Sequence, residues 1–233
     1  MIPDVCVVLP TYQEATTLPT VIADVRRVLP AVTIVVVDDA SPDGTADVAR
    51  HLGATVVARG AKLGLGSAYV AGFEKALTLG SDVVVQMDAD GSHDADDLRR
   101  MVMGLRAGAD LVLGSRYVPG GAVHGWHPLR RLVSRVGCRY AQATLGVPVR
   151  DLTGGFKVWR ATALEATRFH SVRSRGYAFQ VELSYRALLA GLVVREEPIV
   201  FRERRGGQSK MTAGIAAEAA WRVPYLRFST ARP

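Results

Sequence analysis

Cysteine is scarce in this sequence, which contains only Cys6 and Cys138 among 233 residues. Cys6 lies in the apolar run VCVVLP, where a buried thiol is expected. Two cysteines cannot build the dense disulfide framework of a small secreted domain, so we expect a reducing, cytoplasmic compartment. With 48% hydrophobic residues, a chain of this length can bury a large apolar core instead.

Long hydrophobic runs are missing as well. No stretch reaches the roughly 20 apolar residues that a transmembrane helix needs. The first residues, MIPDVCVVLP, contain no basic leader. We therefore expect neither a signal peptide nor a membrane span, and any membrane role would be peripheral.

The glycine motifs of two common nucleotide-binding classes are also absent. A nicotinamide-binding domain needs G-x-G-x-x-G after its first strand, and here that turn reads PTYQEATT. Gly64 and Gly66 have the spacing of the first two glycines, but Tyr69 takes the third position. The two glycines fit either a tight turn entering a helix or a contact with phosphate or sugar. The P-loop pattern GxxxxGK[ST] does not occur, so both classes are excluded.

Aromatic residues make up only 7% of the chain, and they do not alternate with basic residues. Single-stranded nucleic acid is bound through such aromatic platforms, so a nucleic-acid partner is not expected. The basic composition, with a formal charge of +7 and a pI of about 9.8, must then have a cause other than nucleic-acid binding. They fit an anionic membrane surface, a polyanionic small substrate, or solubility alone.

What the sequence does contain is a regular alternation of apolar strand-like runs and amphipathic helices. Strands are predicted at residues 5–10, 33–39, 54–58, 82–88 and 109–116. Helices are predicted at residues 17–29, 66–79 and 96–107, with a shorter one ending at Gly53. This order predicts an α/β fold, a single Rossmann-like domain with a mostly parallel central sheet covered by helices on both faces.

The alternation lapses after residue 121. Residues 126–146 predict a basic amphipathic helix, and the glycine-rich residues 151–160 are expected to return to the sheet. A helix at 178–190, a strand-like segment at 192–204, a loop at 205–212 and a helix at 213–223 complete the chain. No repeat or low-complexity linker interrupts it, so one domain spanning residues 1–233 is the simplest interpretation.

Asp88, Ala89 and Asp90 follow the fourth predicted strand directly. Ligands of parallel sheets bind beyond the carboxyl ends of the strands, and Mg²⁺ or Mn²⁺ takes one or two carboxylates plus substrate phosphates. Glu14, Asp38 and Asp39 are expected at the same edge. The competing interpretation is structural, because Asp94, Asp96 and Asp97 can cap the next helix and Asp38 or Asp39 can cap a turn. His93 has no second His or Cys nearby, so it is interpreted as structural rather than as a zinc ligand.

Basic residues gather in the second half of the chain. They are Arg116, Arg130, Arg131, Arg135, Arg139, Arg202, Arg204, Arg205 and Lys210. Such groups are expected around a diphosphate, although those in the helix at 126–146 also fit a solvated helix face. The same helix carries an apolar stripe of Leu129, Leu132, Val133 and Val136, which fits either core packing or an anionic membrane surface.

The segments VVLPTYQEATTL, VVVDDASPDGT, KLGLGSAY, QMDADGSH, GSRYVPGG, DLTGGFKVWR and VFRERRGGQSKM resemble the polyprenol-phosphate (dolichol-phosphate) mannosyltransferases. These enzymes are inverting glycosyltransferases with the GT-A fold, and the segments cover nearly the whole chain in the family's order. The resemblance implies a nucleotide-sugar-binding part at residues 1–118 and an acceptor and membrane-proximal part at 119–233. Some relatives add transmembrane helices, so a chain without them is expected to be peripheral or to rely on a membrane-anchoring partner protein.

The resemblance also implies roles for particular residues. GDP-mannose would be bound by Pro10, Tyr12, Glu14, Val37, Asp39, Asp88, Ala89, Asp90, Arg204 and Lys210. Mg²⁺ or Mn²⁺ would be held by Asp88, Asp90 and Ser92, although relatives often carry a longer glutamine at the Ser92 position. The phosphate of a polyprenyl phosphate would meet Arg116, Arg130 and Ser134, with Arg131 as the alternative to Arg130. Asp88, Asp90 and Arg116 would be the catalytic residues.

The implied reaction transfers mannose to the lipid phosphate with inversion and needs no general base, because the acceptor is already largely a dianion near neutral pH. Trp126, Leu129, Leu132 and Val133 are candidates for shallow membrane insertion, with Arg131 and Arg135 at anionic headgroups and AAWRVPYLRF as a second contact. A UDP-glucose-dependent synthase, a sugar-1-phosphate nucleotidyltransferase and a non-catalytic anion-binding module are the alternatives. The nucleotidyltransferase is disfavoured because PTYQEATT is not a glycine-rich basic loop.

Overall fold

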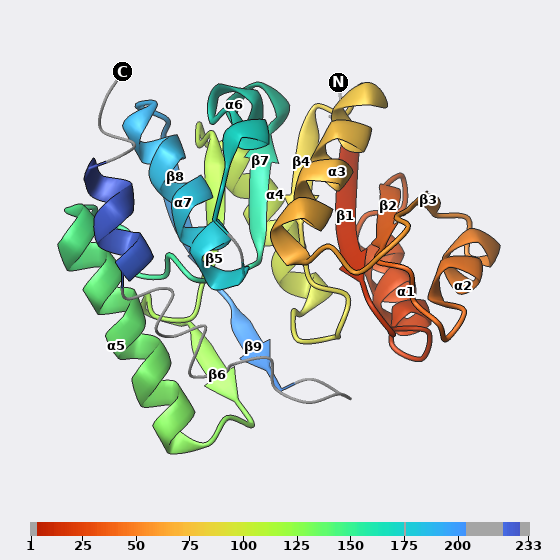
Figure 1. The fold of residues 1–233 in the computed structure, drawn as a ribbon, viewed down its shortest axis with the longest axis horizontal. Coiled ribbons are helices and arrows are strands. Elements are labelled where there is room, and N and C mark those ends of the chain that lie inside the picture. Colours follow the sequence, from red (N-terminus) through yellow and green to blue (C-terminus); the bar gives the residue numbers. More distant parts are fainter. Residues whose placement is uncertain (1–3, 175, 204–220, 229–233) are drawn as a thin grey trace.

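The computed structural model describes residues 4–174, 176–203 and 221–228. Its main sheet has seven strands in the order β3-β2-β1-β4-β7-β5-β8. The strands are β1 (Val5–Thr11), β2 (Thr33–Asp38), β3 (Thr55–Ala58), β4 (Val83–Gln86), β5 (Leu111–Ser115), β7 (Lys157–Arg160) and β8 (Val194–Pro198). All neighbours pair in parallel except β7, which runs antiparallel between β4 and β5. The predicted mostly parallel sheet is confirmed (Figure 1).

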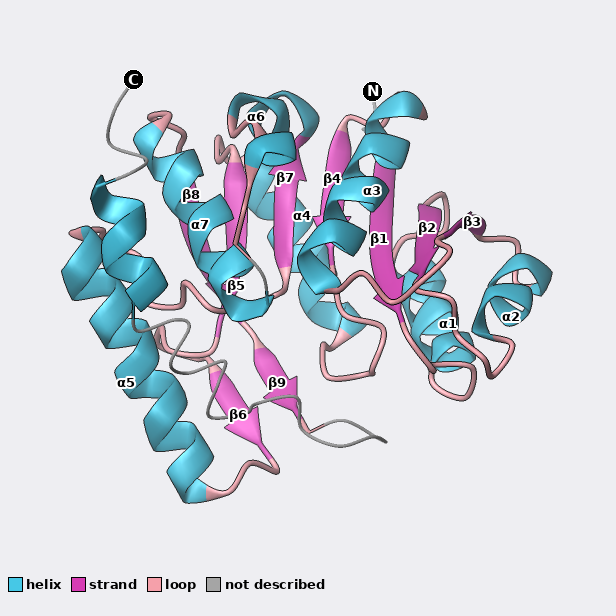
Figure 2. Cartoon of the chain, in the orientation of Figure 1, coloured by secondary structure: helices cyan, strands magenta, loops and turns pink. Residues whose placement is uncertain are grey.

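Helices cover both faces of the sheet (Figure 2). They are α1 (Leu18–Val28), α2 (Thr45–His51), α3 (Leu65–Thr78), α4 (Ala95–Arg106), α5 (Pro128–Leu145), α6 (Ala161–Ala166) and α7 (Gly176–Leu189), with a 3₁₀ turn, η1, at Phe169–Ser171. Val7 and Leu9 of β1 pack on the side of α1 and α4, whereas Cys6 and Val8 pack on the side of α3 and α7. This alternation is the two-residue period of a strand that is buried on both faces.

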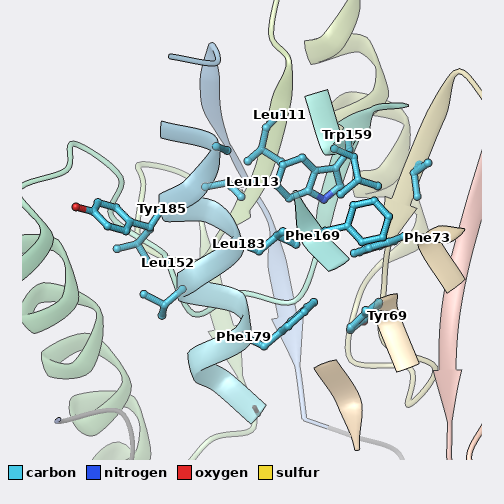
Figure 3. Packing of buried hydrophobic residues seen from close by; sticks show 14 of the residues in the cluster. Tyr69, Phe73, Leu111, Leu113, Leu152, Trp159, Phe169, Phe179, Leu183 and Tyr185 are labelled. Carbon is cyan, nitrogen blue, oxygen red and sulfur yellow. The ribbon is translucent and has the colours of Figure 1, made fainter. Parts of the chain in front are cut away.

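The aromatic residues of the larger core cluster lie on the α3 and α7 side of the sheet (Figure 3). Tyr69 stacks on Phe73 and on Phe179, and Phe169 meets the edge of Phe73. Gly66 has a packing role in this cluster, because a Cβ there would come within 2.9 Å of the Phe179 ring. Gly64 supplies the turn that enters α3, with φ at +96°. The turn interpretation is therefore confirmed for Gly64, whereas Gly66 belongs to the first turn of α3.

The second half of the chain differs from the prediction in three ways. The segment expected as one strand divides into β8 and β9 (Val200–Arg202), and β9 leaves the main sheet to pair with β6 (Ala122–His124). Strand β6, helix α6 and η1 were not predicted. Helix α5 begins at Pro128 rather than at residue 126, because the His127 side chain caps it by accepting the backbone N–H of Leu129 and a proline suits the first helical position.

The helix predicted at 213–223 lies largely outside the described residues, although residues 221–228 are helical. This short helix lies beside α5, and the Arg227 guanidinium donates to the carbonyl oxygen of Thr144 at 2.5 Å (Figure 1). Among the described helices, none combines the length and the hydropathy that crossing a bilayer requires.

Candidate functional site

The Asp88-Ala89-Asp90 segment follows β4 at the point where β4 lies beside β1. From β1 the sheet continues through β2 and β3 in one direction, and β4 begins the other half. Open parallel sheets bind their ligands at such a switch point, beyond the carboxyl ends of the strands. The acidic pair therefore lies where the topology alone places a ligand.

Residues from three segments surround the Asp88 carboxylate. Its Oδ1 accepts a hydrogen bond of 2.7 Å from the Tyr69 hydroxyl, and its Oδ2 lies 3.6 Å from His93 Nε2. A Cβ at Gly155 would come 3.3 Å from Oδ2, so glycine keeps that side of the carboxylate open. The Asp88 side chain is 28% exposed, which leaves it accessible to a ligand at the sheet edge.

Tyr69 is a site residue that the sequence did not identify. It is buried in the aromatic cluster of α3 and looks like a core residue by pattern (Figure 3). Burial, and then the negative charge of Asp88, raises the pKa of the Tyr69 hydroxyl well above its usual value. The hydroxyl therefore stays protonated and remains a hydrogen-bond donor to Asp88 throughout the physiological pH range.

Asp90 and Ser92 lie in the turn that follows Asp88. Asp90 is buried, and its Oδ1 accepts the backbone N–H of Ser92 at 3.0 Å. Ser92 is fully buried, and its hydroxyl oxygen has no hydrogen-bond partner among the described residues. An unsatisfied buried oxygen in the turn that follows two carboxylates is consistent with a cation site, since such groups are costly without a partner.

The candidate metal ligands at this site are all oxygen atoms, which is the ligand type that Mg²⁺ and Mn²⁺ prefer. Within the described ranges, no group of three His, Cys, Asp or Glu residues could form a cage made by the protein alone. Mg²⁺ and Mn²⁺ do not need one, because one or two carboxylates and the phosphates of a substrate suffice. Asp88, Asp90 and the Ser92 hydroxyl therefore fit a divalent cation that binds together with a phosphate ligand.

The acids that follow β2 have extensive contacts within the protein. Asp38 accepts hydrogen bonds from Thr11 and from Ser41, which confirms the turn-capping interpretation for this residue. Asp39 forms an ion pair with Arg59 and accepts the backbone N–H groups of Leu63 and Gly64. Asp39 therefore fixes the turn that leads into α3.

Five other predicted donor residues, all within the described part of the chain, belong to β1, to β2 or to the segments that follow β1 and β4. Pro10 belongs to β1, Val37 is buried in β2, and Ala89 is buried between the two acids. The Lys62 ammonium lies 3.7 Å from the centre of the Tyr12 ring, and the Glu14 carboxylate accepts the Thr17 hydroxyl at 2.6 Å. Arg204 and Lys210 lie outside the described residues.

The predicted capping of α4 is confirmed for Asp94, which accepts the backbone N–H of Asp96.

Arg116 follows β5 and is almost fully buried. Its guanidinium donates two hydrogen bonds of 2.7 Å to the two carboxylate oxygens of Asp151 and a third, of 2.8 Å, to the Thr153 hydroxyl. Burial would lower the pKa of Arg116, but Asp151 raises it above its usual value. Burial would raise the pKa of Asp151, but Arg116 lowers it. Both groups are therefore charged, and the bidentate pair fixes the orientation of Arg116.

Arg130 and Ser134 lie on the inner side of α5. The Arg130 guanidinium lies 4.1 Å from the centre of the Trp126 ring and 3.4 Å from Glu203. Ser134 accepts the Tyr117 hydroxyl at 2.7 Å. Arg131 is exposed, so Arg130 is the arginine of this pair that turns toward the interior.

The predicted insertion of Trp126 into a membrane is wrong. Trp126 is only 7% exposed, because its indole packs against Phe201 and the guanidinium of Arg130. Leu129, Leu132 and Val133 are 63%, 59% and 42% exposed and thus remain candidates.

Lys157 is a fully buried cation at the start of β7, and the sequence did not single it out. Its ammonium donates a 2.7 Å hydrogen bond to the carbonyl oxygen of Gln180. Burial lowers its pKa from 10.5 to about 7, although the charge of Asp151 acts in the opposite direction.

This depressed pKa makes the stability depend on pH. The unfolded chain binds more protons than the folded one between pH 7 and 10.5, so the contribution of Lys157 to the free energy of unfolding should rise with pH there. The expected slope is about 1.4 kcal/mol per pH unit. Urea unfolding of the wild type and of Lys157→Met at pH 7, 7.8 and 8.5 measures it as a difference, in which other titrating groups cancel. Parallel pH profiles for the two proteins would contradict the assignment.

Comparison with known proteins gives a consistent result. Residues 6–168 match the model of glycosyl transferase family 2. The chain is 45% identical over 224 residues to the polyprenol monophosphomannose synthase of Mycolicibacterium smegmatis, covering 93% of this chain and 84% of the relative. It is 43% identical to the undecaprenyl-phosphate mannosyltransferase of Micrococcus luteus, covering 94% and 92%.

Solved structures agree on the fold. A glucosyl-3-phosphoglycerate synthase from Mycobacterium tuberculosis, in complex with Mn²⁺, uridine-diphosphate and glucosyl-3-phosphoglycerate, matches with a TM-score of 0.74 and 20% identity. The match covers 97% of this chain and 81% of that one. The chain is therefore a glycosyltransferase with the GT-A fold that belongs to glycosyltransferase family 2, in which its sequence groups it with the polyprenyl-phosphate mannosyltransferases.

Proposed function

We propose that this enzyme transfers mannose from GDP-mannose to a polyprenyl monophosphate with inversion, giving polyprenyl phosphomannose and GDP. The observation that carries this proposal is the placement of two carboxylates and one guanidinium, groups of opposite charge, at the same edge of the sheet. Asp88 and Asp90 follow β4, and Arg116 follows β5, two strands away. Two strand spacings amount to about 10 Å, which leaves room for one hexose between a donor diphosphate and an acceptor phosphate.

The chemistry divides between these two charged regions. The acceptor phosphate monoester has a second pKa of about 6, so one of its oxygens attacks the anomeric carbon without a general base. The bond from that carbon to the GDP oxygen breaks as the new bond forms, and GDP departs with the electron pair. Attack from the opposite face converts an α-linked donor into a β-linked product. The protein therefore has to align the two phosphates and stabilise the leaving group.

The residues have corresponding roles in the proposal. Asp88 and Asp90 would hold Mg²⁺ or Mn²⁺, which when bound neutralises the donor diphosphate. Tyr69 keeps the Asp88 carboxylate in position through its hydrogen bond. Arg116, oriented by Asp151, and Arg130 would bind the acceptor phosphate, with Ser134 beside them. Arg204 and Lys210 would contact the donor diphosphate.

A donor panel tests the reaction. Purified protein, polyprenyl phosphate in detergent and Mn²⁺ are incubated with radiolabelled GDP-mannose or UDP-glucose, and label in the organic phase is counted. The proposal predicts transfer from GDP-mannose and little from UDP-glucose. Preferred transfer of glucose would replace it with the glucosyltransferase alternative, and an absence of transfer from both would favour a non-catalytic anion-binding module.

We also propose that the enzyme works at the cytoplasmic surface of a membrane, where its lipid acceptor lies. Leu129, Leu132, Val133 and Val136 are exposed along one stripe of α5, and we call them the α5 stripe. Arg131 and Arg135 lie beside it, and Trp221, Tyr225 and Phe228 are exposed on the neighbouring short helix. Exposed apolar residues rimmed by cations suit the boundary between headgroups and acyl chains.

Replacing Leu132 with aspartate should weaken vesicle binding by about tenfold or more, because a leucine side chain contributes about 1.5–3 kcal/mol when it leaves water. Flotation with vesicles that contain anionic lipid measures the bound fraction. Met103→Asp on α4 makes the same kind of change at a residue that is 50% exposed, and serves as the control. Equal flotation of both variants and the wild type would refute the α5 stripe. If the wild type does not bind in the absence of other proteins, an anchoring partner would be required instead.

A further inference from the structure

A pocket of about 410 Å³ lies on the flank of α5, and four arginines line it. Its lining includes Arg116, Arg135, Arg139 and Arg150, together with Tyr117 and Gln142. These residues come from the end of β5, from two successive turns of α5 and from the loop that follows α5. No carboxylate from the described part of the chain belongs to the lining, so the described lining is cationic.

Three of these arginines have no ion-pair partner among the residues that the structure describes. Arg135 and Arg139 are four residues apart on α5, a spacing at which like charges repel, and α5 contains no Asp or Glu. Arg116 is paired with Asp151, but no described carboxylate forms an ion pair with Arg135, Arg139 or Arg150. The repulsion between exposed like charges is small, and an anion bound among them would relieve it.

The two acidic residues near the pocket, Asp151 and Glu196, do not neutralise Arg135, Arg139 or Arg150. Asp151 is occupied by Arg116. The two oxygens of Glu196 accept the backbone N–H groups of Arg150 and Asp151, at 2.8 and 2.9 Å. These contacts fix the backbone at Arg150 and leave its exposed guanidinium available to a ligand.

The pocket adjoins the proposed acceptor position and shares Arg116 with it. Arg130 and Ser134 do not line it, and the Tyr117 hydroxyl donates to Ser134. The Tyr117 ring, which lines the pocket, lies 5.2 Å from the Arg116 guanidinium and 5.7 Å from that of Arg135. Tyr117 and Arg116 therefore form the boundary between the two positions.

We propose that this pocket is a second anion site, which binds a phosphate group. Guanidinium groups bind phosphate oxygens through pairs of parallel hydrogen bonds, and several converging arginines suit a tetrahedral anion with several oxygens. The phosphate can belong to an anionic membrane lipid or be free in solution. The α5 stripe and the exposed Tyr140 lie on the same helix, so the acyl chains of a lipid bound here would lie next to apolar residues. This site goes beyond the proposed reaction, since its occupancy does not depend on the sugar transferred.

The test compares Arg139→Gln/Arg150→Gln with Arg99→Gln/Arg106→Gln, which removes the same charge from exposed arginines of α4 outside the pocket lining. Calorimetry with inorganic phosphate tests the free anion. Flotation with phosphatidylcholine vesicles, with or without phosphatidylglycerol, tests the lipid headgroup. We expect the pocket variant to lose about tenfold or more of its affinity in at least one of these assays, while the control variant retains wild-type affinity. The assay that responds identifies the source of the phosphate.

Two results would overturn the proposal. One is equal binding by the pocket and control variants in both assays, with unchanged thermal unfolding midpoints. The other is a loss of mannosyl transfer to detergent-solubilised acceptor in the pocket variant, because that would assign these arginines to the acceptor position. Neither binding assay contains the sugar donor. A negative result in both would therefore refute the second anion site without bearing on the proposed transfer reaction.

Discussion

Replacing Asp90 with asparagine is expected to lower kcat for mannosyl transfer by about 100- to 1,000-fold, the usual effect of removing a group that stabilises developing charge. Asp90 is buried at the switch point of the sheet, and the substitution keeps its shape while removing its charge. A neutral amide oxygen binds a hard divalent cation more weakly than a carboxylate does, because it lacks the negative charge. The leaving diphosphate would then retain more uncompensated negative charge.

The effect should be confined to the chemistry at this site. Steady-state kinetics over a range of Mn²⁺ concentrations would show a higher metal requirement in Asp90→Asn, together with the lower kcat. Asp96→Asn is the matched control, because it makes the same change at an exposed carboxylate in the first turn of α4. Wild-type kcat in Asp90→Asn, with the fold intact, would remove Asp90 from the mechanism.

Replacing Asp151 with alanine should destabilise the fold by about 3–5 kcal/mol, because it leaves the Arg116 charge buried without its partner. Asp151 is 1% exposed and accepts the Arg116 guanidinium through both carboxylate oxygens. The free energy of unfolding from urea titration at pH 7 measures the change. Asp47→Ala breaks the exposed ion pair with Arg50 and should change stability by less than about 1 kcal/mol.

A double variant separates the stability of this pair from its function. Arg116→Met/Asp151→Leu replaces both charges with apolar groups and should recover much of the lost stability. It should remain inactive, because the proposed acceptor contact is gone. Full activity in the stable double variant would show that the Arg116–Asp151 pair is structural only.

The part of the fold that repeats the unit of strand and helix could be predicted from sequence. Strands such as β1 and β2 are buried on both faces, so their runs of valine are continuous and easy to recognise. The position of Asp88 and Asp90 was predictable for the same reason, because a strand end fixes where the next residues lie.

Pairings between distant segments could not be predicted. Strand β7 inserts antiparallel between β4 and β5, and β9 leaves the main sheet to meet β6. Neither choice leaves a local pattern, because it depends on contacts between residues far apart in sequence. The Arg116–Asp151 pair spans 35 positions, and Tyr69 reaches Asp88 from a helix whose pattern indicates only core packing.

The proposed reaction depends on a divalent cation, held by Asp88 and Asp90, that binds the donor diphosphate. Calorimetry with GDP-mannose tests this binding most directly. The titration is run with Mn²⁺ and with EDTA, on the wild type and on Asp88→Asn/Asp90→Asn. The account predicts binding to the wild type that is at least tenfold tighter with Mn²⁺, and no such gain in the double variant. Equally tight binding in EDTA, with mannosyl transfer retained by the double variant, would contradict it.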